Sequence, residues 1–259
     1  HAIEEFLAIV REAPIRGEIY HLKMSHKRNW ERMDQVLARL EAARDEGLPV
    51  TADIYTYHAS STGLNYDFPA WVKEGGHEKF IGRLQDRESR QRMSAETEMI
   101  PPEDILLVSF RNEDLRHRTG KTLAEVAEMR GTSPVETAMD LFVEDDSRIG
   151  TVRFTMDEDN IRKKIALPWV SFCSDSASLA PEPPFTHAQP HPRAYGSFAR
   201  LLGKYVREEG IIPLEEAVRR LTSLPATNLK LEARGQLAPG YFADVVIFDP
   251  ETIIDRATF

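Results

Sequence analysis

A strand, a helix and a second strand follow one another near the start of the chain, and this order constrains the fold more than any other feature. The segments 18–24 and 50–57 are short, mostly apolar and rich in residues that favour strands. Between them, apolar residues recur at helical spacing from an expected N-cap at Asn29 to a terminating glycine at Gly47. Two strands joined by a helix are parallel, with a right-handed crossover. The sequence therefore predicts a βαβ unit and an α/β fold.

The same alternation of helices and strands continues along the rest of the chain. Glycines and prolines interrupt this alternation between 60 and 102, and 180–192 is a proline-rich loop. Strands that end in polar residues before long loops are typical of a barrel with its chemistry at the carboxyl ends of its strands. We expect helices over 3–10, 78–92, 123–129, 135–142, 157–165, 195–206 and 214–224, and strands over 105–110, 151–156, 169–175 and 240–248.

The charge balance and the single cysteine exclude several classes of protein. The chain has 33 Lys and Arg residues against 42 Asp and Glu, a net charge of −9, whereas a nucleic-acid-binding face needs a basic surplus. No run approaches the roughly 20 apolar residues of a membrane span, and the first residues lack the pattern of a signal peptide. Cys173 stands alone, so no internal disulfide forms. These features fit a cytoplasmic protein without nucleic-acid or membrane partners.

Two polar residues interrupt the first predicted strand. Strand geometry would place His21 and Lys23 on the same face, because successive side chains alternate. A lysine is rarely buried without a partner, so this face either lines a polar cavity or belongs to an exposed edge strand. A βαβ unit places its strands inside a sheet, which favours the cavity.

Asp175 and Arg193 are two further candidates. Asp175 ends an apolar strand and either caps a following helix or serves as a metal ligand or general base. Its place at the carboxyl end of a strand favours catalysis. Arg193 follows a stiff Pro-His-Pro segment, 190–192, and either holds a substrate carboxylate through two hydrogen bonds or lies in an exposed loop. Among the other histidines, His58 is the strongest candidate because it follows a strand end.

Read together, these segments resemble the N-acyl-D-amino-acid deacylases, the D-aminoacylase family of the amidohydrolase superfamily. The last of the matching strings is common to many amidohydrolases, whereas Pro-His-Pro-Arg after Ser-Asp is more specific to the deacylases. The matching strings are 19–23 (Ile-Tyr-His-Leu-Lys), 53–59 (Asp-Ile-Tyr-Thr-Tyr-His-Ala), 71–76 (Trp-Val-Lys-Glu-Gly-Gly), 174–175 (Ser-Asp), 190–198 (Pro-His-Pro-Arg-Ala-Tyr-Gly-Ser-Phe) and 234–249, which begins Arg-Gly-Gln-Leu-Ala-Pro-Gly-Tyr-Phe-Ala-Asp.

The resemblance implies a (β/α)₈ barrel with a small β-sandwich domain. Residues 1–235 would form the C-terminal part of the barrel, with an insertion at about 60–157, and 236–259 would begin the small β domain. It also implies zinc-dependent hydrolysis of the amide bond of N-acyl-D-amino acids or related D-dipeptides. The substrate is a small molecule.

The resemblance also implies roles for five residues. His21 matches a metal-ligand histidine, and Asp175 matches the aspartate that binds metal, activates the water and later protonates the leaving amine. Lys23 and Ser109 match contacts to the substrate carboxylate, and Arg193 matches a loop arginine at the substrate.

The family's other metal ligands, including a His-x-His pair on its first strand, have no counterpart in this chain. The remaining ligands for one or two Zn²⁺ ions are therefore expected outside it, since zinc needs at least three protein ligands. Two alternatives stay open. One is a cyclic-amide reaction of the hydantoinase or dihydroorotase kind. The other is an inactive half-barrel, whose unpaired strand edges would favour a homo-oligomer.

Overall fold

The computed structural model describes residues 1–259 as two compact α/β units. The first unit comprises 1–58, 156–178 and 192–258, and the second comprises 59–155, 179–191 and Phe259. No helix has the length and apolar character that crossing a lipid bilayer requires.

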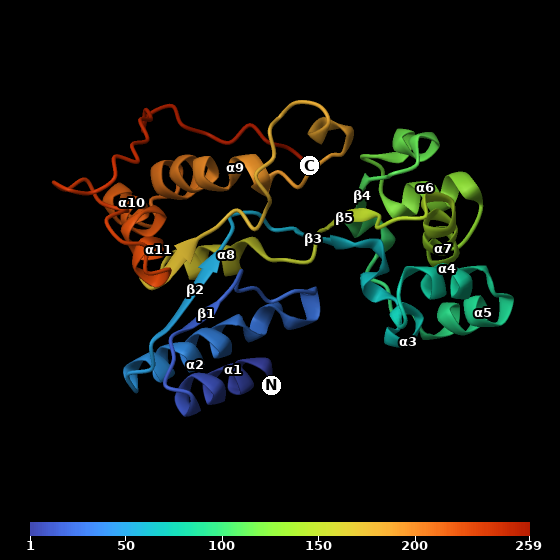
Figure 1. Cartoon of the computed structure of the whole chain (residues 1–259), viewed down its shortest axis with the longest axis horizontal. Coiled ribbons are helices and arrows are strands. Elements are labelled where there is room, and N and C mark those ends of the chain that lie inside the picture. Colours follow the sequence, from blue (N-terminus) through green and yellow to red (C-terminus); the bar gives the residue numbers. More distant parts are fainter. The chain divides into compact units, whose positions relative to one another are not determined.

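The first unit is built on a parallel sheet of three strands in the order β1-β2-β6 (Figure 1). These strands are β1 (Gly17–Ile19), β2 (Val50–Ile54) and β6 (Val170–Phe172). Gly17 pairs with Val50 and Ala52 pairs with Val170, so all three strands run in one direction. The predicted βαβ unit is confirmed, because β1 and β2 are parallel neighbours joined by a helix.

Helices pack against this sheet through apolar faces. They are α1 (Ala2–Glu12), α2 (Met33–Asp45) and α8 (Glu158–Ile165). The 3₁₀ turn η1 (Lys27–Arg32) precedes α2 and buries no residue. Leu7 and Val10 of α1 and Leu40 of α2 are buried in the core that also holds the apolar side chains of β2. Gly17 permits this packing, since an added Cβ would lie 2.5 Å from Val10 Cγ2 and 2.5 Å from Phe6 Cζ.

Among the last helices of the first unit, α9 lies against the segment that follows β2, whereas α10 and α11 contact β6. Gly196 lets α9 approach closely, because an added Cβ would lie 2.0 Å from the Tyr57 hydroxyl. These elements are α9 (Arg193–Arg200), the π-helical segment η6 (Leu201–Glu208) that continues it, α10 (Leu214–Leu221) and α11 (Ser223–Asn228).

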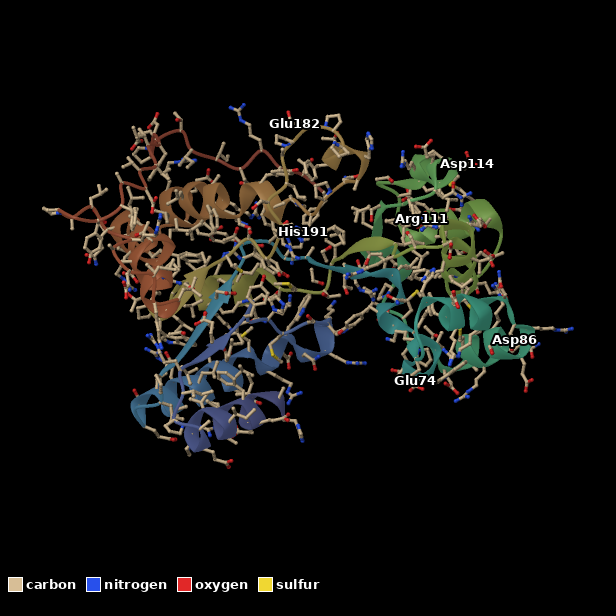
Figure 2. The ribbon with its side chains drawn as sticks, viewed as in Figure 1. Glu74, Asp86, Arg111, Asp114, Glu182 and His191 are labelled. Carbon is tan, nitrogen blue, oxygen red and sulfur yellow. The ribbon has the colours of Figure 1, made fainter.

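The second unit has an antiparallel sheet in the order β3-β5-β4 and its own core. Phe80 and Phe142 meet edge to face there, with ring centroids 5.1 Å apart, and Arg153 forms a buried ion pair with Asp67. Charged side chains such as Asp86 project outward (Figure 2). Its strands are β3 (Ser60–Gly63), β4 (Ile105–Ser109) and β5 (Gly150–Arg153). Its helices are η2 (Leu64–Asp67), α3 (Ala70–Lys73), α4 (His77–Gln85), α5 (Arg87–Glu96), η3 (Pro102–Asp104), η4 (Glu113–Arg118), α6 (Leu123–Arg130), α7 (Pro134–Asp145) and η5 (Phe185–His187).

The first predicted strand is too long. β1 ends at Ile19, and the backbone turns at His21, whose φ is 44°. His21 and Lys23 therefore do not share the face of a strand. The predicted N-cap is also wrong, because the Asn29 side chain donates to the carbonyl of Ser25, and a 3₁₀ turn precedes α2.

Three further features differ from the prediction. The charged stretch 78–92 is two helices, since Asp86 ends α4 and caps α5 through the Ser89 amide. β3 was not predicted and forms because β5 pairs with it. The stretch 240–248 is not a strand, and Val246 and Ile247 are 84% and 93% exposed there. A strand needs a neighbour to satisfy its backbone, and none pairs with this segment.

Candidate active site

The loop that follows β1 carries the first candidate residues and is held by Asp53 of β2. The His21 amide donates to the Asp53 carboxylate at 2.6 Å, and the Leu22 amide donates to the Asp53 carbonyl oxygen at 2.9 Å. The left-handed backbone of His21 costs roughly 1–2 kcal/mol. A hydrogen bond to a carboxylate offsets that cost, because it stabilises by about 1.5–3 kcal/mol. Asp53 thus fixes where the side chains after β1 point.

Asp175 follows β6 and receives two contacts from other elements. The Tyr20 hydroxyl donates to Asp175 Oδ1 at 2.8 Å, and Arg193 Nη1 lies 2.5 Å from Asp175 Oδ2. Its backbone is left-handed, with φ 47°, and no helix begins at residues 176–184. The helix-cap alternative is therefore wrong. The carboxylate of Asp175 thus follows the carboxyl end of β6 and contacts Tyr20, after β1, and Arg193, at the start of α9.

Lys23 lies at the same edge of the sheet. Its Nζ is 3.2 Å from the Tyr55 hydroxyl and 5.0 Å from the centre of that ring. Burial lowers the pKa of Lys23 to about 8, although the charge of Asp175 acts in the opposite direction. β1 is an edge strand of the three-stranded sheet, as one alternative expected, but the ammonium is not exposed, because it is largely removed from water beside the Tyr55 hydroxyl.

Arg193 is the first residue of α9 and is only 7% exposed. Its guanidinium stacks 4.6 Å from the centre of the Tyr55 ring while it pairs with Asp175. The exposed-loop alternative is therefore wrong. His191, two residues earlier, belongs to the second unit, where its Nε2 lies 2.9 Å from the Ala59 carbonyl oxygen (Figure 2).

His21 is half-buried, and its ring centre lies 4.5 Å from that of Tyr20. Burial, and then the positive charge of Lys23, lower the pKa of His21. The neutral imidazole that this favours is the form that binds metals. With the carboxylate of Asp175 it offers donors of the kind that zinc prefers. No group of three His, Cys, Asp or Glu residues in the chain can hold a metal ion, so these donors fit only part of a zinc coordination shell.

Ser109 lies in the second unit, at the end of β4. Its hydroxyl oxygen accepts a hydrogen bond from the Gly150 amide at 3.1 Å, which supports the bulge between β4 and β5. Its predicted contact with a substrate carboxylate stays a prediction.

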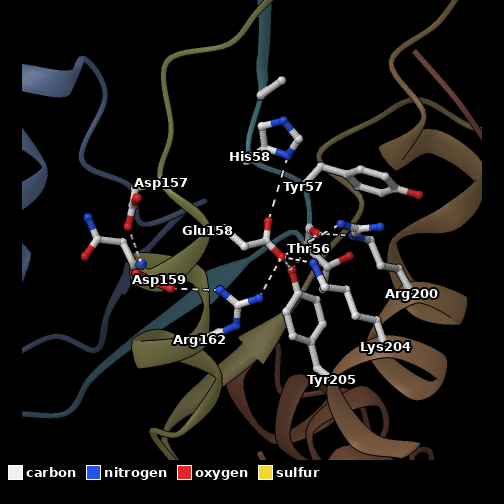
Figure 3. A network of polar contacts seen from close by, with 12 residues as sticks. Thr56, Tyr57, His58, Asp157, Glu158, Asp159, Arg162, Arg200, Lys204 and Tyr205 are labelled. Carbon is white, nitrogen blue, oxygen red and sulfur yellow. Dashed lines mark hydrogen bonds and ion pairs between the residues drawn. The ribbon is translucent and has the colours of Figure 1, made fainter. Parts of the chain in front are cut away.

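His58 takes part in a polar network around Glu158, the first residue of α8 (Figure 3). Its Nδ1 lies 3.8 Å from Glu158 Oε2, and the Tyr205 hydroxyl donates to Glu158 Oε1 at 2.6 Å. Lys204 pairs with the same carboxylate. The network joins α8 to η6.

Three residues at the site were not predicted: Tyr20, Asp53 and Tyr55. Each belongs to a string that carries the family resemblance, 19–23 or 53–59. An acid inside an apolar strand, as at Asp53, was the available signal, since buried carboxylates need partners.

The chain is similar to known amidohydrolases. The model of the amidohydrolase family matches residues 101–259, more than half of the chain. Two proteins of Alcaligenes xylosoxydans xylosoxydans, N-acyl-D-glutamate deacylase and D-aminoacylase, are each 33% identical over 258 residues, which are 100% of this chain and 44% of those proteins. A dihydroorotase of Lactobacillus johnsonii is 44% identical over 55 residues, 21% of this chain and 13% of its own. The chain thus spans less than half the length of the deacylases it matches.

Solved structures show the same relationship. The crystal structure of N-acyl-D-glutamate deacylase from Bordetella bronchiseptica, complexed with zinc and a phosphonate mimic of the tetrahedral intermediate, matches with a TM-score of 0.76 and 33% identity. A crystal structure of D-aminoacylase matches with a TM-score of 0.72 and 32% identity. Each match covers 99% of this chain and 45% of the other. The family model, the relatives and the structures agree, and the chain belongs to the amidohydrolase family.

Proposed function

We propose that the complete protein containing this chain hydrolyses the amide bond of N-acyl-D-amino acids. One observation carries the proposal: Asp175, in the segment that follows β6, is held by Tyr20 and Arg193, beside Lys23. A carboxylate for proton transfer and cations for a carboxylate substrate thus share one edge of a parallel sheet. The matched relatives are named as deacylases of D-amino-acid derivatives, which supports the same substrate class.

We propose that the first unit is part of a (β/α)₈ barrel. In this interpretation residues 1–235 form its C-terminal part, with an insertion at about 60–157, and 236–259 begin a small β-sandwich domain. The parallel order β1-β2-β6 with helices between its strands supports the barrel. The sandwich rests on the family resemblance.

His21 and Asp175 would bind zinc in the complete protein, together with ligands from outside this chain. Zinc, when bound, lowers the pKa of water and polarises a carbonyl oxygen. His21 is suited to this role because its neutral form is favoured. Asp53 fixes the His21 backbone from the neighbouring strand.

Asp175 carries the proton in this mechanism. Its carboxylate accepts a proton from the attacking water and donates it to the amide nitrogen as the carbon–nitrogen bond breaks. Tyr20 and Arg193 each contact one of its two oxygens, which fixes the plane of the carboxylate. A second lone pair on each oxygen stays available for the proton.

Lys23 binds the free carboxylate of the substrate. Its ammonium is largely desolvated, which strengthens an ion pair with an incoming anion. Arg193, the first residue of α9, stacks on the Tyr55 ring and supplies a second positive charge at the site. Ser109 is proposed as a further carboxylate contact, on the family resemblance alone.

A substrate panel tests the proposal. The complete protein is loaded with zinc and assayed with N-acetyl-D-amino acids, their L-enantiomers and dihydroorotate. We expect hydrolysis of the D-substrates only. Dihydroorotate turnover that exceeds deacylation would instead support the cyclic-amide alternative, which the short dihydroorotase match favours. Absence of zinc binding by the complete protein would refute both reactions.

A further inference from the structure

A fully buried lysine lies behind the candidate active site. Lys164, near the end of α8, is 1% exposed, and none of the ion pairs in the chain includes it. Its Nζ donates to the carbonyl oxygen of Leu22 at 2.8 Å. Burial lowers its pKa to about 7. A buried ammonium without a carboxylate is expensive, so packing alone does not account for a lysine here.

The acceptor of this hydrogen bond lies between two residues of the proposed site. Leu22 separates His21 from Lys23, and its carbonyl belongs to the peptide group that joins Leu22 to Lys23. The loop lies outside the strand ladder, because β1 ends at Ile19. Hydrogen bonds from outside the loop must therefore fix its backbone.

Asp53 and Lys164 supply complementary anchors to this loop. Asp53 holds the amides of His21 and Leu22, both of which are donors. Lys164 holds the carbonyl of Leu22, an acceptor, from a different element. Together they fix the peptide groups on both sides of the Leu22 Cα, and with them the directions of the side chains of His21 and Lys23.

We propose that Lys164 is a positioning residue that orients His21 toward the metal and Lys23 toward the substrate carboxylate. The inference rests on the proposed function, since it assigns a purpose to a loop whose side chains carry that function. Groups that orient metal ligands typically change metal affinity or activity by about 10- to 100-fold when they are removed.

The test uses Lys164→Met in the complete protein, with Arg220→Met as a matched control. Arg220 is also a fully buried cation that donates to main-chain carbonyls, those of Val170 at 2.6 Å and Ile165 at 2.5 Å. Neither acceptor lies in the loop after β1. Three quantities are measured: amide hydrogen exchange of residues 20–24 in the metal-free protein, zinc affinity, and the KM and kcat for an N-acetyl-D-amino acid.

We expect Lys164→Met to speed exchange in 20–24, to weaken zinc binding about 10-fold and to raise KM. Arg220→Met should leave all three at wild-type values in the folded protein. Unchanged exchange and zinc affinity in Lys164→Met, or equal effects of both variants, would overturn the proposal. If Lys164→Met does not fold, Lys164→Gln replaces it. The side-chain nitrogen of glutamine is one bond closer to the backbone than that of lysine, so the contact with Leu22 is lost. Wild-type exchange and zinc affinity in Lys164→Gln would also overturn the proposal.

The two proposals fail separately. A wild-type protein that does not hydrolyse N-acetyl-D-amino acids would contradict the proposed function. Amide hydrogen exchange and zinc affinity need no substrate, so they would still test the role of Lys164. A wild-type enzyme that is active, together with a fully active Lys164→Met, would contradict only the positioning role.

Discussion

Removal of the Lys23 ammonium should weaken the binding of substrates that carry a free carboxylate. Lys23→Met deletes the charged ammonium and keeps an unbranched side chain that is one atom shorter. In the structure the ammonium is largely buried and has the Tyr55 hydroxyl as its hydrogen-bonding partner at 3.2 Å, so an incoming carboxylate gains a strong contact. A hydrogen bond between charged groups is worth about 1.5–3 kcal/mol, which corresponds to a rise in KM of roughly 10- to 150-fold.

The assay compares an N-acetyl-D-amino acid with the same compound whose carboxyl group is converted to an amide. Lys23→Met should raise KM for the acid and leave KM for the neutral amide nearly unchanged, with a small effect on kcat for both. Lys163→Met is the matched control, because Lys163 is a solvent-exposed lysine that pairs with Asp34 on the surface. Equal losses with acid and amide would refute the reasoning, since they would place Lys23 away from the substrate carboxylate.

Two further predictions concern stability. The pKa of Lys164 is lowered to about 7 in the folded state, whereas an exposed lysine titrates near about 10.4, so between these values the unfolded state binds more protons and the free energy of unfolding rises with pH. Denaturant titrations of the metal-free protein at pH 6 and pH 9 should show this rise in the wild type and a smaller rise in Lys164→Met. An equal change in the free energy of unfolding in both proteins would contradict the burial of a titrating ammonium. Gly196→Ala should lower the melting temperature, since its Cβ would meet the Tyr57 hydroxyl at 2.0 Å and overpacking costs about 1–3 kcal/mol. Gly82→Ala in α4 meets nothing within 4 Å and should stabilise by up to about 1 kcal/mol, so melting curves that rank the two substitutions in the opposite order would refute the packing argument.

Elements with strong local patterns could be predicted from the sequence. The buried stripe of α2 and the alternating burial of β2 follow directly from the spacing of apolar residues. The expected helix at 157–165 is α8, which Asp157 caps through the Asn160 amide. These features depend on neighbours within a few residues, which the sequence displays.

Features that depend on distant partners could not be predicted. β1 ends early because the His21 amide turns toward Asp53, 32 residues away, and no local signal marks that contact. The same holds for Tyr20, whose hydroxyl donates to Asp175 across 155 residues. The sequence placed Lys23 within the predicted strand 18–24 and Asp175 at the end of another, but only the fold shows that Tyr55 meets Lys23 and that Arg193 meets Asp175.

The central claim is that Asp175 transfers the proton in amide hydrolysis. The most direct test is the turnover of an N-acetyl-D-amino acid by zinc-loaded Asp175→Asn in the complete protein, with zinc content measured in the same samples. General acid–base catalysis contributes about 100- to 10,000-fold, so kcat should fall by at least about 100-fold while the protein stays folded. Undiminished turnover by a zinc-loaded Asp175→Asn enzyme would contradict the account.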